Sequence, residues 1–347
     1  MGPELYDYEL PQELVAQEPA ARRGDARMMV LLGAGEPVHA RARELPRHLD
    51  PRALVVVNDS RVVPARVHVT HAGREMELLI CDPRPGLAPG ATFRAWVRGA
   101  KRLKAGDVVQ HGEHVARYVE EDPVDPRARV FRVEAGEWME VMRERGEIPL
   151  PPYIRRPQGP STEDAVRYQT VYANQPGSVA APTAGLHWEP EVLAQLDVVR
   201  LTLHVGPGTF LPLEAKDVRA HKVGAERIEV GEDAARRIAA AKAEGRPIVA
   251  IGTTVTRALE AVAQAHGGVV APYAGETDLV ITPGFSFKVI DALITNFHLP
   301  RSSLLMLVCS FGGRERVLAA YAAAVAERYR FYSYGDCMVL SREAGAV

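Results

Sequence analysis

Three histidines stand in short segments that leave room for a ligand next to the backbone. His187 follows a run of small residues, His204 precedes a glycine-proline-glycine turn, and His298 lies two residues after Asn296. Imidazole exchanges a proton near neutral pH, which suits general acid or base catalysis. A single histidine of this kind is more often structural than catalytic. Three of them in such settings are harder to dismiss, so His187, His204 and His298 are candidate catalytic residues.

A second candidate site is the start of a predicted helix at Gly252-Thr253-Thr254. This motif follows the apolar run 248–251, so free backbone N–H groups and two hydroxyls are expected at the end of a buried strand. Such a helix start binds carboxylate or phosphate groups. Arg257 comes one turn later on a similar face. The alternative is an ordinary helix cap with a surface arginine, which is the more frequent meaning of this pattern alone.

The segment from Tyr329 to Asp336 is dense in aromatic residues. Rings such as that of Tyr334 could stack on a planar base, while the Asp336 carboxylate meets a cationic group. Simple packing of the core and its rim is the alternative.

A run of basic residues is a candidate contact for phosphate groups. The chain has 42 basic and 44 acidic residues and a formal net charge of −2, so a nucleic-acid partner requires a local basic surface. A run of this kind is usually a solvated hairpin, but on a nearly neutral protein it is a candidate phosphate contact. The run consists of Arg98, Lys101, Arg102 and Lys104.

Composition excludes several classes of protein. Cys81, Cys309 and Cys337 are scattered without CxxC spacing, which argues against a disulfide framework and a structural zinc. The acidic first residues do not fit a secretory signal, and no apolar run approaches the roughly 20 residues of a membrane span. The chain has no P-loop, no HExxH motif and no complete dinucleotide-binding glycine motif. We therefore expect a cytoplasmic protein without metal.

With 347 residues, the chain is long enough for two domains. Residues 61–133 show short alternating runs between turn signals, typical of a small antiparallel barrel, and residues 137–145 a short helix. Elsewhere strands alternate with helices, as in a layered α/β domain. We predict an α/β main domain from residues 1–60 and 147–347, with a β-barrel domain of residues 61–146 inserted into it. The expected strands of the main domain include 53–57, 198–203, 248–251 and 278–282, and the expected helices 231–243, 253–265 and 315–328.

Long sequence blocks resemble one enzyme family from end to end. The blocks are LPQELVAQEP (10–19), NDSRVVPAR (58–66), GEIPLPPYI (146–154), RYQTVYA (167–173), GSVAAPTAGLH (177–187), LHVGPGTF (203–210), IGTTVTRALE (251–260), DALITNFHLPRSSLLML (291–307) and YRFYSYGDCM (329–338). They are similar to the S-adenosylmethionine:tRNA ribosyltransferase-isomerases of the queuosine pathway.

The resemblance implies a reaction without a metal or redox cofactor. S-adenosylmethionine is consumed as co-substrate: its ribosyl carbons pass to the aminomethyl group of a 7-deazaguanine in the tRNA anticodon, with release of adenine and methionine, to give epoxyqueuosine. On this basis His187, His204 and His298 are the expected acid/base set. Arg257, with Thr253 and Thr254, is expected to bind the methionine carboxylate, and Asp336 to bind the aminomethyl group. Asn296 and Tyr334 complete the expected substrate site, and the protein is expected to be a monomer.

The chain departs from the family pattern at two places. Trp188 stands where the family usually has phenylalanine. Val223, Gly224 and Ala225 stand where relatives commonly have methionine, histidine and serine, although His221 and Glu226 remain. Two other functions stay open from the residues: a tRNA methyltransferase that uses the same donor, and a non-catalytic RNA-binding protein.

Overall fold

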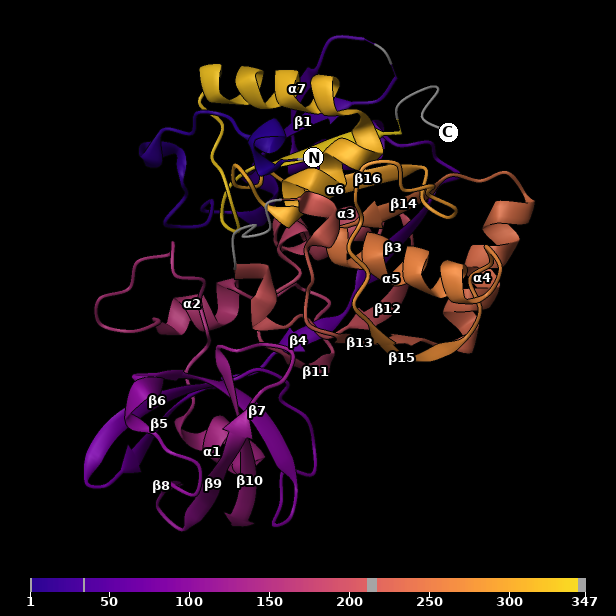
Figure 1. The fold of residues 1–347 in the computed structure, drawn as a ribbon. Coiled ribbons are helices and arrows are strands. Elements are labelled where there is room, and N and C mark those ends of the chain that lie inside the picture. The colour runs from indigo at the N-terminus through magenta and orange to yellow at the C-terminus, as the bar shows by residue number, and fades with distance from the viewer. Residues whose placement is uncertain (1, 34, 211–216, 343–347) are drawn as a thin grey trace.

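A nine-stranded mixed sheet organises the larger part of the molecule (Figure 1). The computed structural model describes residues 2–33, 35–210 and 217–342. Buried β-branched and aliphatic residues form the central strands of the sheet, as expected for strands covered on both faces. In spatial order the strands are β15 (Tyr273–Thr277), β13 (Glu226–Val230), β12 (Asp197–Leu203), β3 (Leu54–Asn58), β14 (Ile248–Ile251), β16 (Ala292–Asn296), β17 (Cys337–Ser341), β1 (Arg27–Leu31) and β2 (Val38–Arg41).

The direction of the strands brings several chain segments to one edge of the sheet. Strands β12, β3, β14 and β16 are mutually parallel, so their carboxyl ends meet at that edge. Strand β17 runs antiparallel to β16, with Asn296 opposite Cys337, so the residues just before β17 reach the same edge. In open α/β sheets this is the edge where ligands bind. The edge therefore collects the ends of four strands and the start of a fifth.

Helices and loops bury the two faces of the sheet in separate clusters. Alternate residues of β3 point to opposite faces: Leu54 and Val56 join one cluster, and Val55 and Val57 the other. The first cluster includes residues of helices α4 to α7, and the second is completed by residues such as Trp188. The helices of this part are α2 (Thr162–Arg167), α3 (Pro190–Leu193), α4 (Glu232–Ala243), α5 (Thr253–Ala265), α6 (Ser303–Gly312) and α7 (Arg314–Ala326).

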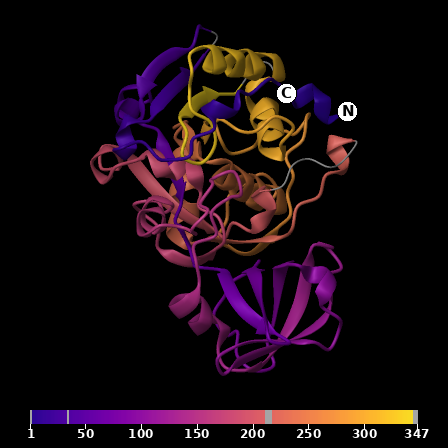
Figure 2. The same ribbon diagram turned by 90° about the vertical axis from the view of Figure 1, so that its left-hand side faces the viewer.

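A separate antiparallel sheet of six strands forms the smaller lobe (Figures 1 and 2). The strands pair in the order β10-β7-β6-β5-β8-β9, and β9 also pairs with β10, which closes the sheet. Phe93, Phe131 and Trp138 pack inside it. The elements are β5 (Arg66–His71), β6 (Arg74–Ile80), β7 (Thr92–Arg98), β8 (Val108–His111), β9 (His114–Glu121), β10 (Ala128–Ala135) and helix α1 (Trp138–Arg145). Two short parallel strands, β4 (Ser60–Val62) and β11 (Gln175–Ser178), lie between the lobes in Figure 1.

The mixed α/β class with a separate antiparallel sheet is confirmed, and the division into domains at residues 60 and 146 stays a prediction. The predicted strand 278–282 is wrong, because side chains take the place of a strand partner there. The Leu279 N–H donates to Thr277 Oγ1 at 3.1 Å, and the Leu279 carbonyl accepts from Arg257 Nε at 2.9 Å. Within the described residues, none of the helices is long and apolar enough to cross a membrane.

Candidate active site

A cavity with an empty volume of about 800 Å3 lies at the carboxyl edge of the large sheet. We call it the first cavity. Its described lining holds aromatic, hydroxyl and small side chains and no Asp, Glu, Lys or Arg. It therefore suits a planar, polar and largely uncharged ligand. The lining includes Tyr153, Tyr168, Ala180–Ala184, Gly252, Thr253, Thr254, Thr295, Asn296, His298, Ser302, Leu304, Tyr332 and Ser333.

The start of α5 supplies one wall of the first cavity. Gly252 has a positive φ of 104°, and a Cβ there would lie 3.4 Å from Thr254 Oγ1, so glycine suits this strand-to-helix turn. Thr253 and Thr254 both line the cavity. The first N–H groups of a helix have no partner within the helix. The aligned peptide dipoles of this 13-residue helix make its start positive. Because Thr253 and Thr254 lie at that start, the positive end of α5 faces the cavity.

His298 is the one predicted catalytic histidine that lines the first cavity. Its Nε2 lies 2.7 Å from Thr295 Oγ1, and its backbone is held by Tyr8 and Tyr321 through bonds of 2.5 and 2.9 Å. Burial lowers the pKa of His298 to about 3, so the ring is neutral at pH 7. A neutral ring in a fixed orientation is in the form that accepts a proton.

Asn296 joins the first cavity to His187. Its Nδ2 donates to the Tyr332 carbonyl at 2.9 Å and lies 3.0 Å from His187 Nε2. Since Nδ2 is a donor, Nε2 must accept, which places the proton of the neutral ring on Nδ1. Burial, and then the positive charge of Arg330, lowers the pKa of His187 to about 4. Asn296 Oδ1 is buried and has no partner among the described residues, so it remains as an acceptor.

The structure does not bring the three histidines into one cavity. His187 lines a smaller third cavity, described below, and His204 lines none of the three. Burial, with Arg227 nearby, lowers the pKa of His204 to about 4. Its Nδ1 is buried without a partner in the described part of the chain, and a Cβ on Gly177 would lie only 2.8 Å from it. The acid/base role of each histidine stays a prediction.

Arg257 lines a second cavity, with an empty volume of about 1370 Å3, and not the first. Its Nε donates to the Leu279 carbonyl, Nη1 pairs with the buried Glu226, and Nη2 is buried without a partner among the described residues. The predicted grouping of Arg257 with Thr253 and Thr254 is therefore split between two cavities. The lining of the second cavity includes Arg94, Asp125, Arg127, Lys222, Val223, Gly224, Ala225, Glu226, Arg257 and Leu304.

The two cavities adjoin, because Leu304 lines both. Residues of the six-stranded lobe, such as Arg94 and Arg127, line the second cavity together with residues of the main sheet and α5. The three positions that depart from the family pattern, 223–225, also line it. In contrast to the first cavity, its lining carries charges of both signs.

The aromatic side chains of the first cavity differ from the predicted ones. Tyr334 points elsewhere: its hydroxyl donates to Asp164 Oδ1 at 3.1 Å, and its ring lines the third cavity. Tyr153 and Tyr332 take this place, with ring centroids 4.2 Å apart. Tyr332 has a φ of +72°, and this turn of the chain leaves Tyr334 facing the third cavity. The Tyr153 hydroxyl is fixed by Ser333 Oγ at 2.6 Å.

Asp336 does not line any of the three cavities. It is buried, and its two oxygens accept hydrogen bonds from the backbone N–H groups of Arg27 and Arg330 at 2.8 and 2.7 Å. Through these bonds the carboxylate stabilises the backbone where β1 and β17 begin. The predicted contact of Asp336 with an aminomethyl group has no geometric support.

The basic run extends from Arg98, the last residue of β7, into the connection to β8, in the six-stranded lobe. The side chains of Arg98, Lys101, Arg102 and Lys104 are all exposed and line none of the cavities. Arg98 lies 3.8 Å from Glu77.

Within the described residues, no group of three or more His, Cys, Asp or Glu side chains has the arrangement of a metal site.

Comparison with known proteins identifies the family. The family model described as "Queuosine biosynthesis protein" matches residues 4–340. The chain belongs to this family. It is 48% identical to the S-adenosylmethionine:tRNA ribosyltransferase-isomerase of Anaeromyxobacter sp. (strain Fw109-5), over 97% of this chain and 98% of that protein. The enzyme of the same name from Nitratidesulfovibrio vulgaris (strain DP4) is 45% identical, over 96% of both chains.

A solved structure has the same overall fold. The crystal structure of the S-adenosylmethionine tRNA ribosyltransferase from Thermotoga maritima aligns with a TM-score of 0.52 and 30% identity, over 97% of this chain and 99% of that chain. The family and its named relatives make this chain an enzyme of the transferase class.

Proposed function

We propose that the enzyme transfers and isomerises the ribosyl moiety of S-adenosylmethionine onto 7-aminomethyl-7-deazaguanine in a tRNA anticodon. The products are epoxyqueuosine in the tRNA, free adenine and methionine. The near full-length likeness to enzymes named for this transfer carries the proposal. Two adjoining cavities, one for each substrate, support it. The site of action is the cytoplasm, and the active form is a monomer.

The second cavity is assigned to S-adenosylmethionine. The donor carries a carboxylate, an ammonium and a sulfonium, and this cavity has both cationic and anionic side chains. Arg257 is the partner for the carboxylate. Its guanidinium is held on two sides by Leu279 and Glu226, and Nη2 is left as the free donor.

The first cavity is assigned to the deazaguanine base. Its tyrosines offer a surface for stacking, and Asn296 Oδ1 is an unused acceptor for a base N–H. The absence of acidic side chains from its described lining, together with the positive end of α5, disfavours a protonated aminomethyl group. The amine is therefore bound in its neutral form, which is the form that attacks.

The reaction needs proton transfers at three atoms. The sulfonium makes a neighbouring ribosyl C–H acidic, the amine nitrogen loses a proton as it bonds to a ribosyl carbon, and adenine gains one as it leaves. The bond between adenine and its ribosyl carbon breaks with its electron pair on the adenine nitrogen, which takes up that proton. The C–S bond breaks with its electron pair on sulfur, which gives methionine. His298 is the group that accepts or returns a proton within the first cavity, and His187 acts next to it through Asn296. Because every electron pair moves within the two substrates, the reaction needs no redox cofactor, and we propose that it also proceeds without a metal.

Product analysis tests this proposal. The protein is mixed with S-adenosylmethionine and an anticodon stem-loop RNA that carries the aminomethyl base, and small molecules are separated by chromatography. Free adenine and methionine in equal amounts are expected. Release of S-adenosylhomocysteine would show a methyltransferase. Intact donor together with tight RNA binding would show a non-catalytic RNA-binding protein.

A further inference from the structure

A third and much narrower cavity, which is open to solvent, lies next to the first. The segment Pro19–Ala26, the end of α2 and the residues around His187 form its walls. Ser333 lines both the first and the third cavity, and His187 in the third contacts Asn296 in the first. A group bound at the opening of the third cavity is therefore close to a base bound in the first.

The charged side chains of this cavity are two arginines, Arg23 and Arg167. Backbone carbonyls fix both guanidinium groups: Arg23 donates to Leu186 and Val166 at 3.0 and 3.2 Å, and Arg167 to Ala20 and Ala21 at 2.5 and 3.3 Å. Carbonyl groups orient a guanidinium, but they are neutral and leave its positive charge in place. Arg167 Nε is also buried without a partner among the described residues, so it remains as a donor.

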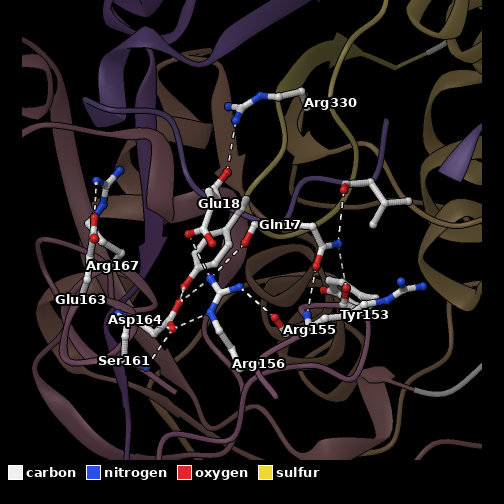
Figure 3. Close-up of polar contacts among 12 residues, drawn as sticks. Gln17, Glu18, Tyr153, Arg155, Arg156, Ser161, Glu163, Asp164, Arg167 and Arg330 are labelled. Carbon is white, nitrogen blue, oxygen red and sulfur yellow. Dashed lines mark hydrogen bonds and ion pairs between the residues drawn. The ribbon is translucent and has the colours of Figure 1, made fainter. Parts of the chain in front are cut away.

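Carboxylates do little to neutralise this pair. Among the described residues Arg23 forms no ion pair within 4.0 Å, and Glu189 attracts its charge only as a minor effect beside burial and Arg167. Glu163 approaches Arg167 only at 3.8 Å, with 73% of its side chain exposed. Figure 3 shows that the nearby carboxylates of Asp164 and Glu18 are both held by another arginine, Arg156.

The two like charges therefore repel each other. Burial, and then Arg167, lowers the pKa of the Arg23 guanidinium. A bound anion would remove this repulsion. Oriented arginine forks match the oxygens of a phosphate group better than any other side chain does.

We propose that Arg23 and Arg167 bind a backbone phosphodiester of the substrate RNA, adjacent to the nucleotide whose base enters the first cavity. This inference rests on the proposed function for the identity of the RNA. It places the phosphate contact in the main part of the molecule, whereas the basic run Arg98–Lys104 lies on the six-stranded lobe. A phosphate held here fixes the register of the RNA, so that only the neighbouring base reaches the first cavity.

Salt dependence of RNA binding tests the inference without any turnover. Each phosphate contact contributes about 0.7 to 0.9 to the slope of log Kd against log salt concentration. We therefore compare R23Q and R167Q with the wild type, using the anticodon stem-loop RNA in a series of KCl concentrations and no donor. R236Q is the matched control, because Arg236 is an exposed arginine on α4 and lines none of the three cavities. A variant with R98Q and K101Q tests the six-stranded lobe.

R23Q and R167Q are each expected to raise the Kd for RNA about tenfold, as loss of a charged hydrogen bond does. Each should also lower the salt slope, by at most the roughly 0.7 to 0.9 of the one phosphate that the two arginines share. The Kd for S-adenosylmethionine should be unchanged in both, and R236Q should match the wild type. Wild-type slopes in folded R23Q and R167Q would overturn the inference, as would a loss of slope confined to the R98Q and K101Q variant.

A scan of the RNA keeps the test decisive if an arginine variant does not fold. Single phosphates around the target nucleotide are replaced by uncharged methylphosphonates. One replacement is expected to weaken binding to the wild type, and to weaken binding to R23Q less, because only Arg167 then contacts that phosphate. If no replacement weakens wild-type binding, the inference is refuted. Failure of adenine release would instead refute the proposed function, because these binding measurements contain no donor.

Discussion

Substitutions in the buried pair Arg257–Glu226 separate a role in donor binding from a role in stability. Both side chains are only 8% exposed. R257Q leaves the Glu226 charge buried with one partner fewer, which costs about 3 to 5 kcal/mol of unfolding free energy. E226Q leaves the Arg257 charge buried without its carboxylate partner, at a similar cost in unfolding free energy. The double variant R257Q/E226Q removes both charges and is expected to recover most of the stability.

The three variants should differ in donor affinity in another way than they differ in stability. A hydrogen bond between charged groups contributes about 1.5 to 3 kcal/mol, so loss of the Arg257 contact should raise the Kd for S-adenosylmethionine about 10- to 150-fold. The increase is expected in R257Q and in R257Q/E226Q, but not in E226Q, which keeps the guanidinium. Urea unfolding measures stability, and isothermal titration calorimetry measures the Kd. A folded R257Q/E226Q variant with wild-type donor affinity would falsify the assignment of the second cavity.

Three further predictions concern the first cavity and the buried histidines. H298A should lower turnover about 10²- to 10⁴-fold with little change in donor Kd, whereas H266A, at an exposed histidine, should match the wild type in the same adenine assay. The pKa values of His298 and His187, about 3 and 4, lie below the roughly 6.5 of an unfolded histidine, so the unfolded chain binds more protons. Stability should therefore fall as the pH is lowered from about 6.5 towards 4, by up to about 1.4 kcal/mol per pH unit for each histidine, and urea titrations of H298A should show a shallower fall. Y153L should raise the Kd for the modified RNA about 5- to 150-fold through lost stacking and leave donor affinity unchanged; equal loss of both affinities would contradict the assignment of the first cavity to the base.

Local features of the site could be predicted from the sequence because their cause is local. Gly252 followed by two threonines indicates a helix start after a strand, and a helix start carries its free N–H groups with it wherever it lies. The loops around His298 and Asn296 were recognised in the same way. What could not be predicted was their neighbours. The bond between Asn296 and His187 joins residues 109 positions apart, and it depends on which segments meet at the sheet edge.

Where the structure places a predicted site residue differently from the prediction, a specific physical cause can be named. One turn of helix places Arg257 near Thr253, but Glu226 from β13 pairs with Arg257, and the two residues line different cavities. In an extended chain Tyr332 and Tyr334 would share a face, but the positive φ of Tyr332 breaks this alternation. Asp336 is polar in an aromatic segment, which is typical of a ligand contact, yet two backbone N–H groups occupy its oxygens. Each of these depends on a partner distant in sequence or on a backbone angle that the residue type disfavours.

The most direct test of the account follows the atoms of the donor. S-adenosylmethionine labelled with ¹³C in its ribosyl carbons, and separately in its methyl carbon, is incubated with the enzyme and the aminomethyl-bearing stem-loop RNA. The RNA is then digested and its nucleosides are analysed by mass spectrometry. We predict that all five ribosyl carbons appear in one modified nucleoside and that the methyl label does not. Methyl label in the RNA, or no ribosyl label in it, would contradict the account.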